Sequence, residues 1–131
     1  MVNAPTIDVL LIEDNDVFRE ALELMLAVMP DIRVVGSVGD GRAAVDLCEE
    51  TRPDVVLMDY RLPGLDGVEA TAAIGSLGSD AAVVVLTASV ENGELGALYE
   101  AGAVACLTKD SDVNEIVGAI REAAGRSAPL V

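Results

Sequence analysis

The chain has 131 residues, of which 52% are hydrophobic and 2% aromatic, and its 8 basic and 23 acidic residues give a formal net charge of −15. This length suits one hydrophobic core and is too short for two ordinary domains, so we expect a single folded unit. The negative charge would repel nucleic acid and anionic lipid, which argues against DNA or membrane-surface binding by this chain alone.

Strand and helix patterns alternate five times along the chain: short runs of Val, Ile, Leu and Ala are followed by apolar residues at helical spacing. The first three pairs are strand Ile7–Ile12 with a helix from Val17 to Pro30, strand Ile32–Val35 ending at Gly36 with a helix from its cap Asp40 to about Glu50, and strand Val55–Met58 with a helix capped by Asp66. The last two are strand Ala82–Leu86 with a short helix from Leu95 to Gly102, and strand Val104–Leu107 with a helix capped by Asp112.

The helices carry further local signals. Asp66 with Glu69, and Asp112 with Glu115, have the spacing of capping boxes. Apolar residues at helical spacing outline the first helix (Val17, Phe18, Ala21, Leu22, Met25 and Val28 or Met29) and the fourth (Leu95, Leu98 and Tyr99). The expected apolar faces of the other helices are Ala44, Leu47 and Cys48 in the second, Val68, Ala72 and Leu77 in the third, and Val113, Ile116, Val117, Ile120 and Ala124 in the fifth.

Five strand–helix units joined by right-handed crossovers place helices on both faces of a parallel sheet. The sequence therefore predicts an α/β fold of the flavodoxin-like, doubly wound (βα)₅ type. In its five-stranded parallel sheet the strand order is 2-1-3-4-5, which places the first and third strands together at the switch point.

Polar side chains follow four of these strands at the point where each strand ends. Glu13 and Asp14 follow the first strand, Asp59 the third, Thr87 the fourth, and Lys109, the only lysine, the fifth. The carboxyl ends of parallel strands lie at one edge of the sheet, where open α/β folds bind their ligands. This set of groups suits a phosphoryl group and a hard metal ion.

Three neighbouring carboxylates repel one another unless a cation lies among them, and Mg²⁺ is the natural one. Asp59 can then attack phosphorus and form an acyl phosphate. Lys109 and Thr87 can each donate a hydrogen bond to the product. Histidine is absent from the chain, so carboxylates must carry the phosphate chemistry.

These motifs closely resemble the receiver domain of bacterial two-component response regulators. The residues that carry the resemblance are Glu13 and Asp14 in LLIEDN, Asp59 in PDVVLMDYRLPGLDG, Thr87 in VVVLTA and Lys109 in AGAVACLTKD. The resemblance implies a receiver over residues 6–125, with 126–131 as the start of a linker or a C-terminal tail. It implies that Asp59 accepts a phosphoryl group from a sensor histidine kinase, and that Glu13, Asp14, Asp59 and the main-chain carbonyl of Arg61 bind Mg²⁺.

The LPGLDG loop and the KDSD ending look most like the subfamily in which a receiver precedes a LuxR- or FixJ-type helix-turn-helix domain. No such output domain is seen, and an excised receiver is favoured over a stand-alone one. DNA would be contacted only through that absent domain. Homodimerisation is left open, and no enzymatic activity is expected beyond the chain's own phosphorylation and dephosphorylation.

By the same resemblance, the face formed by the fourth helix, fifth strand and fifth helix is the output surface. Its expected exposed residues are Tyr99, Glu100, Glu115 and Arg121. Arg61 and Ser89, each two positions beyond a site residue, would tune hydrolysis of the acyl phosphate.

Two positions depart from the family pattern. Cys106 stands where receivers usually carry the aromatic residue that reports activation, so signalling is expected to rely on Thr87 and on movement of the segment before the fourth helix, aided by Gly93 and Gly96. Asp110 follows Lys109 where many receivers have a proline after a cis peptide, which leaves the peptide isomer open.

Alternatives from other classes remain. One is a receiver-like module that binds a partner without phosphorylation. Another is a phosphatase or transferase, which would usually need a second acid two residues beyond the nucleophile, where Arg61 stands.

The sequence shows no apolar stretch of about 18 residues and no basic secretion signal in Met1–Pro5, so no membrane association and a cytoplasmic location are expected. Cys48 and Cys106 lack metal-ligand spacing and are interpreted as buried free thiols.

Overall fold

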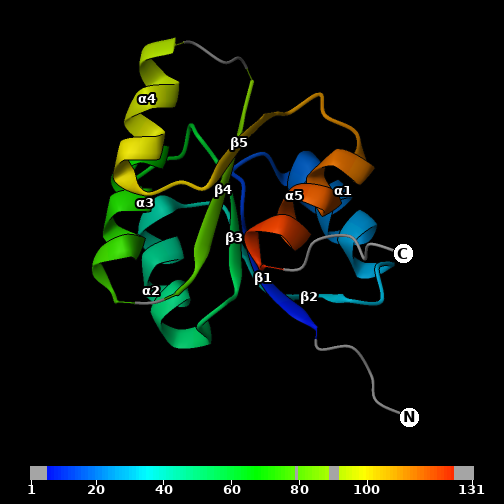
Figure 1. Cartoon of the computed structure of the whole chain (residues 1–131). Helices are drawn as coiled ribbons and strands as arrows, with labels where there is room; N and C mark the ends of the chain where they lie inside the picture. Colours follow the sequence, from blue (N-terminus) through cyan, green and yellow to red (C-terminus); the bar gives the residue numbers. More distant parts are fainter. Residues whose placement is uncertain (1–5, 79, 89–91, 126–131) are drawn as a thin grey trace.

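The computed structural model describes residues 6–78, 80–88 and 92–125. Within them the chain alternates five strands and five helices in one parallel sheet with the order β2-β1-β3-β4-β5, which confirms the predicted fold (Figure 1). The elements are β1 (Ile7–Ile12), α1 (Asp16–Ala27), β2 (Ile32–Val38), α2 (Gly41–Thr51), β3 (Val55–Asp59), α3 (Gly67–Ser76), β4 (Ala82–Thr87), α4 (Asn92–Ala101), β5 (Ala105–Thr108) and α5 (Val113–Ala123).

The helices cover the two faces of the sheet in separate layers. Figure 1 shows α2, α3 and α4 on one side and α1 and α5 on the other. Because side chains alternate along a strand, Val9 and Leu11 of β1 pack toward the α1/α5 side, whereas Leu10 and Ile12 pack toward the α2/α3/α4 side. Both faces of the central strands are therefore buried, as the almost uniformly apolar strand sequences predict.

Most local predictions are confirmed. Asp40 caps α2, and both capping boxes are present, with Asp66 and Asp112 accepting from Glu69 and Glu115. The predicted α5 face is also confirmed, because Ile116, Val117 and Ile120 are buried, with Val113 and Ala124 packed against the same core.

Three predicted details are wrong. Strand β2 continues through Gly36 to Val38, because its ladder with β1 resumes after a register shift between Val9 and Leu10. In α1, the predicted apolar residue Val17 is exposed and Leu26 is buried instead, while Phe18, Leu22, Met25 and Met29 contact the core as predicted. In α3, Ala72 is exposed, and the buried residues are Gly67, Ala70, Thr71 and Ile74; Val68 and Leu77 pack against the core as predicted.

The loop between β3 and α3 is held against the start of α2. The Gly41 amide donates to the Pro63 carbonyl at 3.0 Å, and a Cβ on Gly41 would lie only 2.5 Å from the carbonyl oxygen of Leu65. A glycine is therefore required at this close approach. The contact fixes the loop that begins directly after Asp59.

Replacing Gly41 with alanine is expected to reduce the free energy of unfolding by about 1–3 kcal/mol, because the added methyl group must displace backbone. Urea denaturation measures this change. Gly75→Ala is the matched control: a Cβ added at this position of α3 would meet nothing within 4 Å beyond the helix's own backbone, and the change should raise stability by about 0.5–1 kcal/mol. A Gly41→Ala protein as stable as the parent would contradict the proposed packing role.

None of the helices in the described part of the chain has the length and apolar character needed to cross a bilayer. Within the described residues neither Cys48 nor Cys106 forms a disulfide, as predicted, although Cys106 is only partly buried.

Candidate functional site

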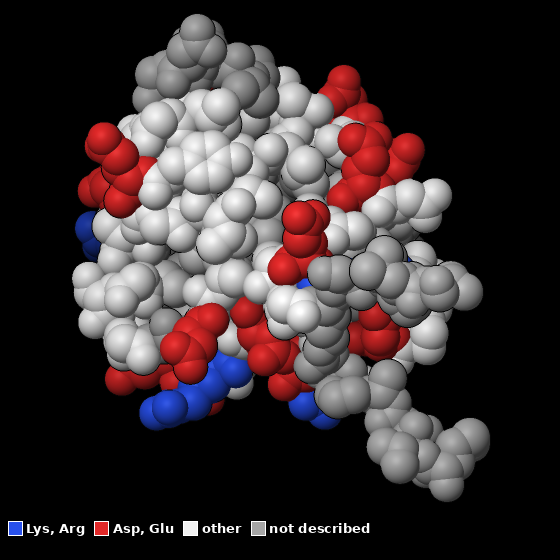
Figure 2. Space-filling view, viewed as in Figure 1, with Lys and Arg blue, Asp and Glu red and all other residues white. Residues whose placement is uncertain are grey.

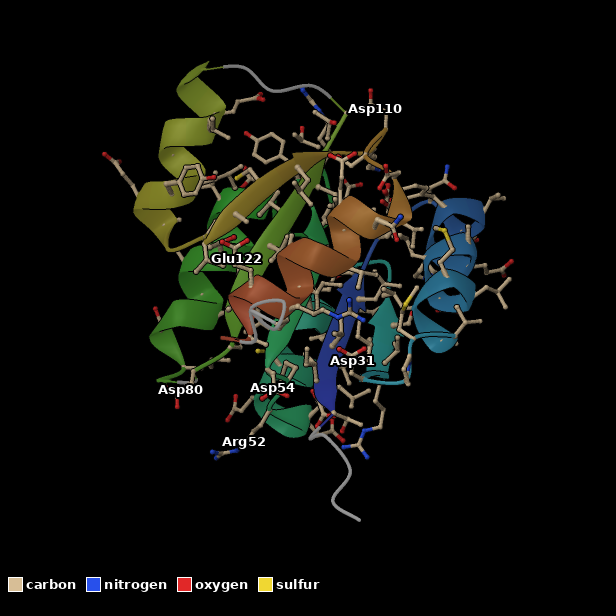
Figure 3. All side chains as sticks on the ribbon, turned by 45° about the vertical axis from the view of Figure 1, so that its right-hand side comes forward. Asp31, Arg52, Asp54, Asp80, Asp110 and Glu122 are labelled. Carbon is tan, nitrogen blue, oxygen red and sulfur yellow. The ribbon has the colours of Figure 1, made fainter. Side chains whose placement is uncertain are left out.

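The predicted site residues gather at the carboxyl end of the sheet. Figure 3 marks that end by Asp110, just beyond β5, and the opposite end by Asp54 and Asp80 ahead of β3 and β4. Strands β1 and β3 are hydrogen-bonded neighbours, which brings the residues after Ile12 beside Asp59. The switch point is thus the place where the acids meet.

Glu13, Asp14 and Asp59 form an acidic cluster in which one carboxylate oxygen from each lies within 4.8 Å of the others. Glu13 is 1% exposed and Asp59 5% exposed, whereas Asp14 is open to solvent. Burial raises the pKa of Glu13 above its ordinary value, although contacts with Lys109 and the Asn15 amide oppose this shift. Two buried carboxylates and one exposed one create a strongly anionic site with one open side.

The ammonium group of Lys109 lies between the two buried carboxylates. Its Nζ is 2.9 Å from Oδ2 of Asp59 and 2.8 Å from Oε1 of Glu13. Partial burial alone would lower the pKa of Lys109, but its close contacts with the carboxylates of Glu13 and Asp59 outweigh that effect and raise it. Lys109 therefore stays protonated and, among the residues that the structure describes, is the one positive side chain that contacts both buried acids.

The cluster fits a small divalent cation. Carboxylate oxygens are the ligands that Mg²⁺ prefers, and one exposed acid leaves room for the water molecules that this ion retains. Oε1 of Glu13 is buried and meets the Lys109 ammonium as an ion pair without the geometry of a hydrogen bond. It is therefore an oxygen with a lone pair still available to a cation.

Thr87 ends β4 and lies beside both neighbouring site strands. It is 6% exposed, and its carbonyl accepts a hydrogen bond of 2.8 Å from the Lys109 amide. The preceding residue, Leu86, is in register with Asp59 of β3. The structure thus places Thr87 between the strands that deliver the nucleophile candidate and the lysine.

Arg61 begins the loop after Asp59, and its amide donates to Oδ1 of Asp59 at 3.3 Å. Its guanidinium is exposed and lies 3.9 Å from Glu94 of α4. The metal-binding role of its carbonyl remains a prediction. Ser89, the other residue expected to tune hydrolysis, lies outside the described residues, as does most of the segment between β4 and α4.

Three side chains near the acids were missed as site residues. Asn15 caps α1 with its side chain, and its main-chain amide donates to Oε2 of Glu13 at 3.0 Å. Arg19 donates to the Glu13 carbonyl at 2.7 Å, and the Phe18 ring centroid lies 5.1 Å from Nζ of Lys109. Their position in the sequence could have indicated them, because the first turn of a helix that follows an acidic strand end lies at the same edge of the sheet as the acids.

The structure describes both positions that depart from the family pattern, Cys106 and Asp110. The Lys109–Asp110 peptide is trans, since the described residues contain no cis bond. Cys106 lies on β5 and packs with the α2/α3/α4 side of the core, within hydrogen-bonding reach of the Tyr99 side chain from α4. Burial raises the pKa of the Cys106 thiol.

The face of α4, β5 and α5 is the one viewed in Figure 2, where white surface fills the centre and red acidic groups lie mainly around it. Tyr99 is 47% exposed, and Glu100 and Glu115 are exposed as expected. The prediction that Arg121 is an exposed residue of this face is corrected. Its guanidinium donates two hydrogen bonds of 2.8 and 3.0 Å to Asp31, which lies in the loop before β2.

Comparison with known proteins gives a consistent result. The profile of the response regulator receiver domain family matches residues 9–121. The transcriptional regulatory protein LiaR of Bacillus subtilis is 43% identical over 117 residues, which are 89% of this chain and 56% of LiaR. The chain spans about half the length of the curated relatives it matches.

Solved structures agree. The receiver domain of the putative response regulator NarL from Mycobacterium tuberculosis has a TM-score of 0.90 and 34% identity, covering 93% of this chain and 98% of that one. The receiver domain of the sensor histidine kinase PA1611 from Pseudomonas aeruginosa, with a magnesium ion in its active-site cleft, has a TM-score of 0.82 and 34% identity, covering 92% and 98%. Matches to LuxR- and NarL-type regulators confirm the predicted subfamily resemblance.

Proposed function

This chain belongs to the response regulator receiver domain family, and we propose that it is a signalling switch operated by phosphorylation of Asp59. The observation that carries this proposal is the arrangement around one buried carboxylate. Asp59 lies in an acidic cluster with Glu13 and Asp14, and the only lysine of the chain touches it at 2.9 Å.

In the proposed reaction an Asp59 carboxylate oxygen attacks the phosphorus of a phosphohistidine in a sensor histidine kinase, or of a small acyl phosphate. The new O–P bond forms as the bond from phosphorus to the leaving nitrogen or oxygen breaks, and the product is an aspartyl phosphate. The Lys109 ammonium moves from its carboxylate partners to one phosphoryl oxygen, and the Thr87 hydroxyl donates to another. Contacts that exist only in the phosphorylated state are what shift a conformational equilibrium.

We propose that Glu13, Asp14, Asp59 and the main-chain carbonyl of Arg61 hold Mg²⁺. When bound, the ion would offset the negative charge that otherwise keeps an anionic phosphoryl group away from Asp59. The paired carboxylates, the available lone pair on buried Glu13 and the magnesium in the similar receiver of PA1611 support this assignment.

The partner class is a sensor histidine kinase, with which response regulator receivers interact. The output is proposed to be control of transcription through a DNA-binding segment outside this chain, since the matched relatives are transcriptional regulators about twice its length. The α4-β5-α5 face is the proposed output surface. Homodimerisation, a cytoplasmic location and the lack of any activity beyond self-phosphorylation and self-dephosphorylation stay predictions.

The direct test is the intact mass of the protein after incubation with acetyl phosphate, with and without Mg²⁺. A single phosphoryl addition that requires the ion supports the proposal. An unchanged mass, under conditions that label another receiver, would favour the phosphorylation-independent interaction module instead.

Magnesium binding should be measurable without phosphorylation. At about 100 times its dissociation constant, Mg²⁺ should raise the free energy of unfolding by about 2.7 kcal/mol. Asp14→Asn should remove more than half of this gain and leave metal-free stability nearly unchanged, because Asp14 is exposed.

Urea denaturation with Mg²⁺ or with a chelator measures the effect. Glu20→Gln is the matched control, because it removes an exposed acid from α1 outside the cluster. An equal Mg²⁺ gain in Asp14→Asn and in the parent would contradict the role of Asp14.

A further inference from the structure

We propose that Phe18 is a positioning residue for Lys109, and that the face of its ring holds the ammonium group in place for phosphoryl transfer. This inference rests on the proposed function. Phe18 is the only phenylalanine of the chain, and the sequence alone presents it as an ordinary core-facing residue of α1.

The geometry is that of a cation–π contact. Nζ of Lys109 lies 5.1 Å from the centroid of the Phe18 ring, within the range of about 6 Å for this interaction. The same ammonium meets carboxylates of Glu13 and Asp59 at 2.8 and 2.9 Å. Two acids and one aromatic ring therefore surround the ammonium, which lies at the end of a flexible four-carbon chain.

Phe18 is itself held firmly. Its main-chain amide donates to the Oδ1 of the capping residue Asn15 at 2.9 Å, and the main-chain amide of Asn15 in turn donates to Oε2 of Glu13. The side chain is half-buried and packs against the α1/α5 side of the core. The backbone that carries the ring is thus linked by hydrogen bonds to the strand end that supplies the acids.

The ring differs from the carboxylates in one respect that matters for a switch. Glu13 and Asp59 are proposed metal ligands, and Asp59 becomes the phosphorylated group, so both must change partners during the reaction. A phenyl ring neither binds Mg²⁺ nor accepts a phosphoryl group. Phe18 can therefore attract the ammonium before and after the metal and phosphoryl group arrive, and limit the positions that Lys109 samples.

The lone lysine allows a test that does not depend on activity. In protein labelled only in lysine with ¹³C and ¹⁵N, Lys109 gives a single set of side-chain NMR signals. Ring currents should shift its Hε protons upfield relative to the unfolded chain. This shift should persist at saturating Mg²⁺, remain in Phe18→Tyr, and disappear in Phe18→Leu and in the longer, unbranched ring-less variant Phe18→Met.

The second readout is the rate of phosphorylation by acetyl phosphate at saturating Mg²⁺. Phe18→Leu and Phe18→Met should be about threefold to tenfold slower than the parent, which corresponds to a cation–π contact in a partly desolvated site. Phe18→Tyr should keep a rate within about twofold. Leu24→Ala, on the exposed side of α1, controls for substitution in this helix.

The outcomes separate this inference from the proposed function. Rates for Phe18→Leu equal to the parent, or for Phe18→Tyr as low as for Phe18→Leu, overturn the role of the ring. An Hε signal without an upfield shift in the parent, or one that loses the shift with Mg²⁺, overturns the geometry in the active state. A parent protein that cannot be phosphorylated at all overturns the proposed function, while the NMR comparison still reports on the contact.

Discussion

Replacing Asp59 with asparagine is expected to abolish phosphoryl addition, with a rate at least about 1,000-fold below that of the parent. The amide oxygen of asparagine is a far weaker nucleophile than a carboxylate and cannot form a stable acyl phosphate. The side chain keeps its size, so the buried position after β3 stays filled. Intact mass spectrometry after incubation with acetyl phosphate and Mg²⁺ measures the loss.

The control for this substitution is Asp80→Asn, which removes an exposed acid ahead of β4 at the opposite end of the sheet (Figure 3). It should be phosphorylated at the parental rate. Circular dichroism should show both variants folded. Persistent addition to Asp59→Asn, mapped by peptide analysis to Glu13 or Asp14, would show that another acid of the cluster accepts the phosphoryl group.

Replacing Lys109 with methionine should change two properties in opposite directions. Phosphorylation should slow by about 100-fold, because the variant lacks the donor that meets charge developing on the phosphoryl oxygens. Binding of Mg²⁺ should tighten by about tenfold, because the ammonium no longer competes with the ion for the oxygens of Glu13 and Asp59. Methionine retains most of the apolar stem of lysine, which preserves packing.

Rates of acetyl phosphate labelling and isothermal titration with Mg²⁺ give the two quantities. Lys109→Arg is the matched variant: it keeps the positive charge but carries a planar, wider head group, so Mg²⁺ affinity should stay near the parental value while phosphorylation remains impaired. If Mg²⁺ bound more weakly to Lys109→Met than to the parent, the lysine would be organising the acids rather than competing with the metal.

Much of the fold could be predicted because its signals are local. Apolar runs that end in Glu13, Asp59 and Thr87 define strand ends, and capping acids such as Asp66 and Asp112 define helix starts. Errors arose where neighbouring elements decide the outcome. Strand β2 extends past Gly36 because β1 offers it further hydrogen bonds, and the exposed sides of α1 and α3 depend on how each helix is rotated on the sheet.

The sequence by itself determined which chemical groups reach the carboxyl edge of the sheet, because the period of a strand and the direction of parallel strands leave little freedom there. Only the tertiary structure decided how those groups meet. The Lys109 ammonium between Glu13 and Asp59, the Phe18 ring beside it, and the pairing of Arg121 with Asp31 across 90 residues all depend on rotamers and on packing between distant elements. Local patterns carry no information about such contacts, since each is chosen by the combined shape and charge of several elements.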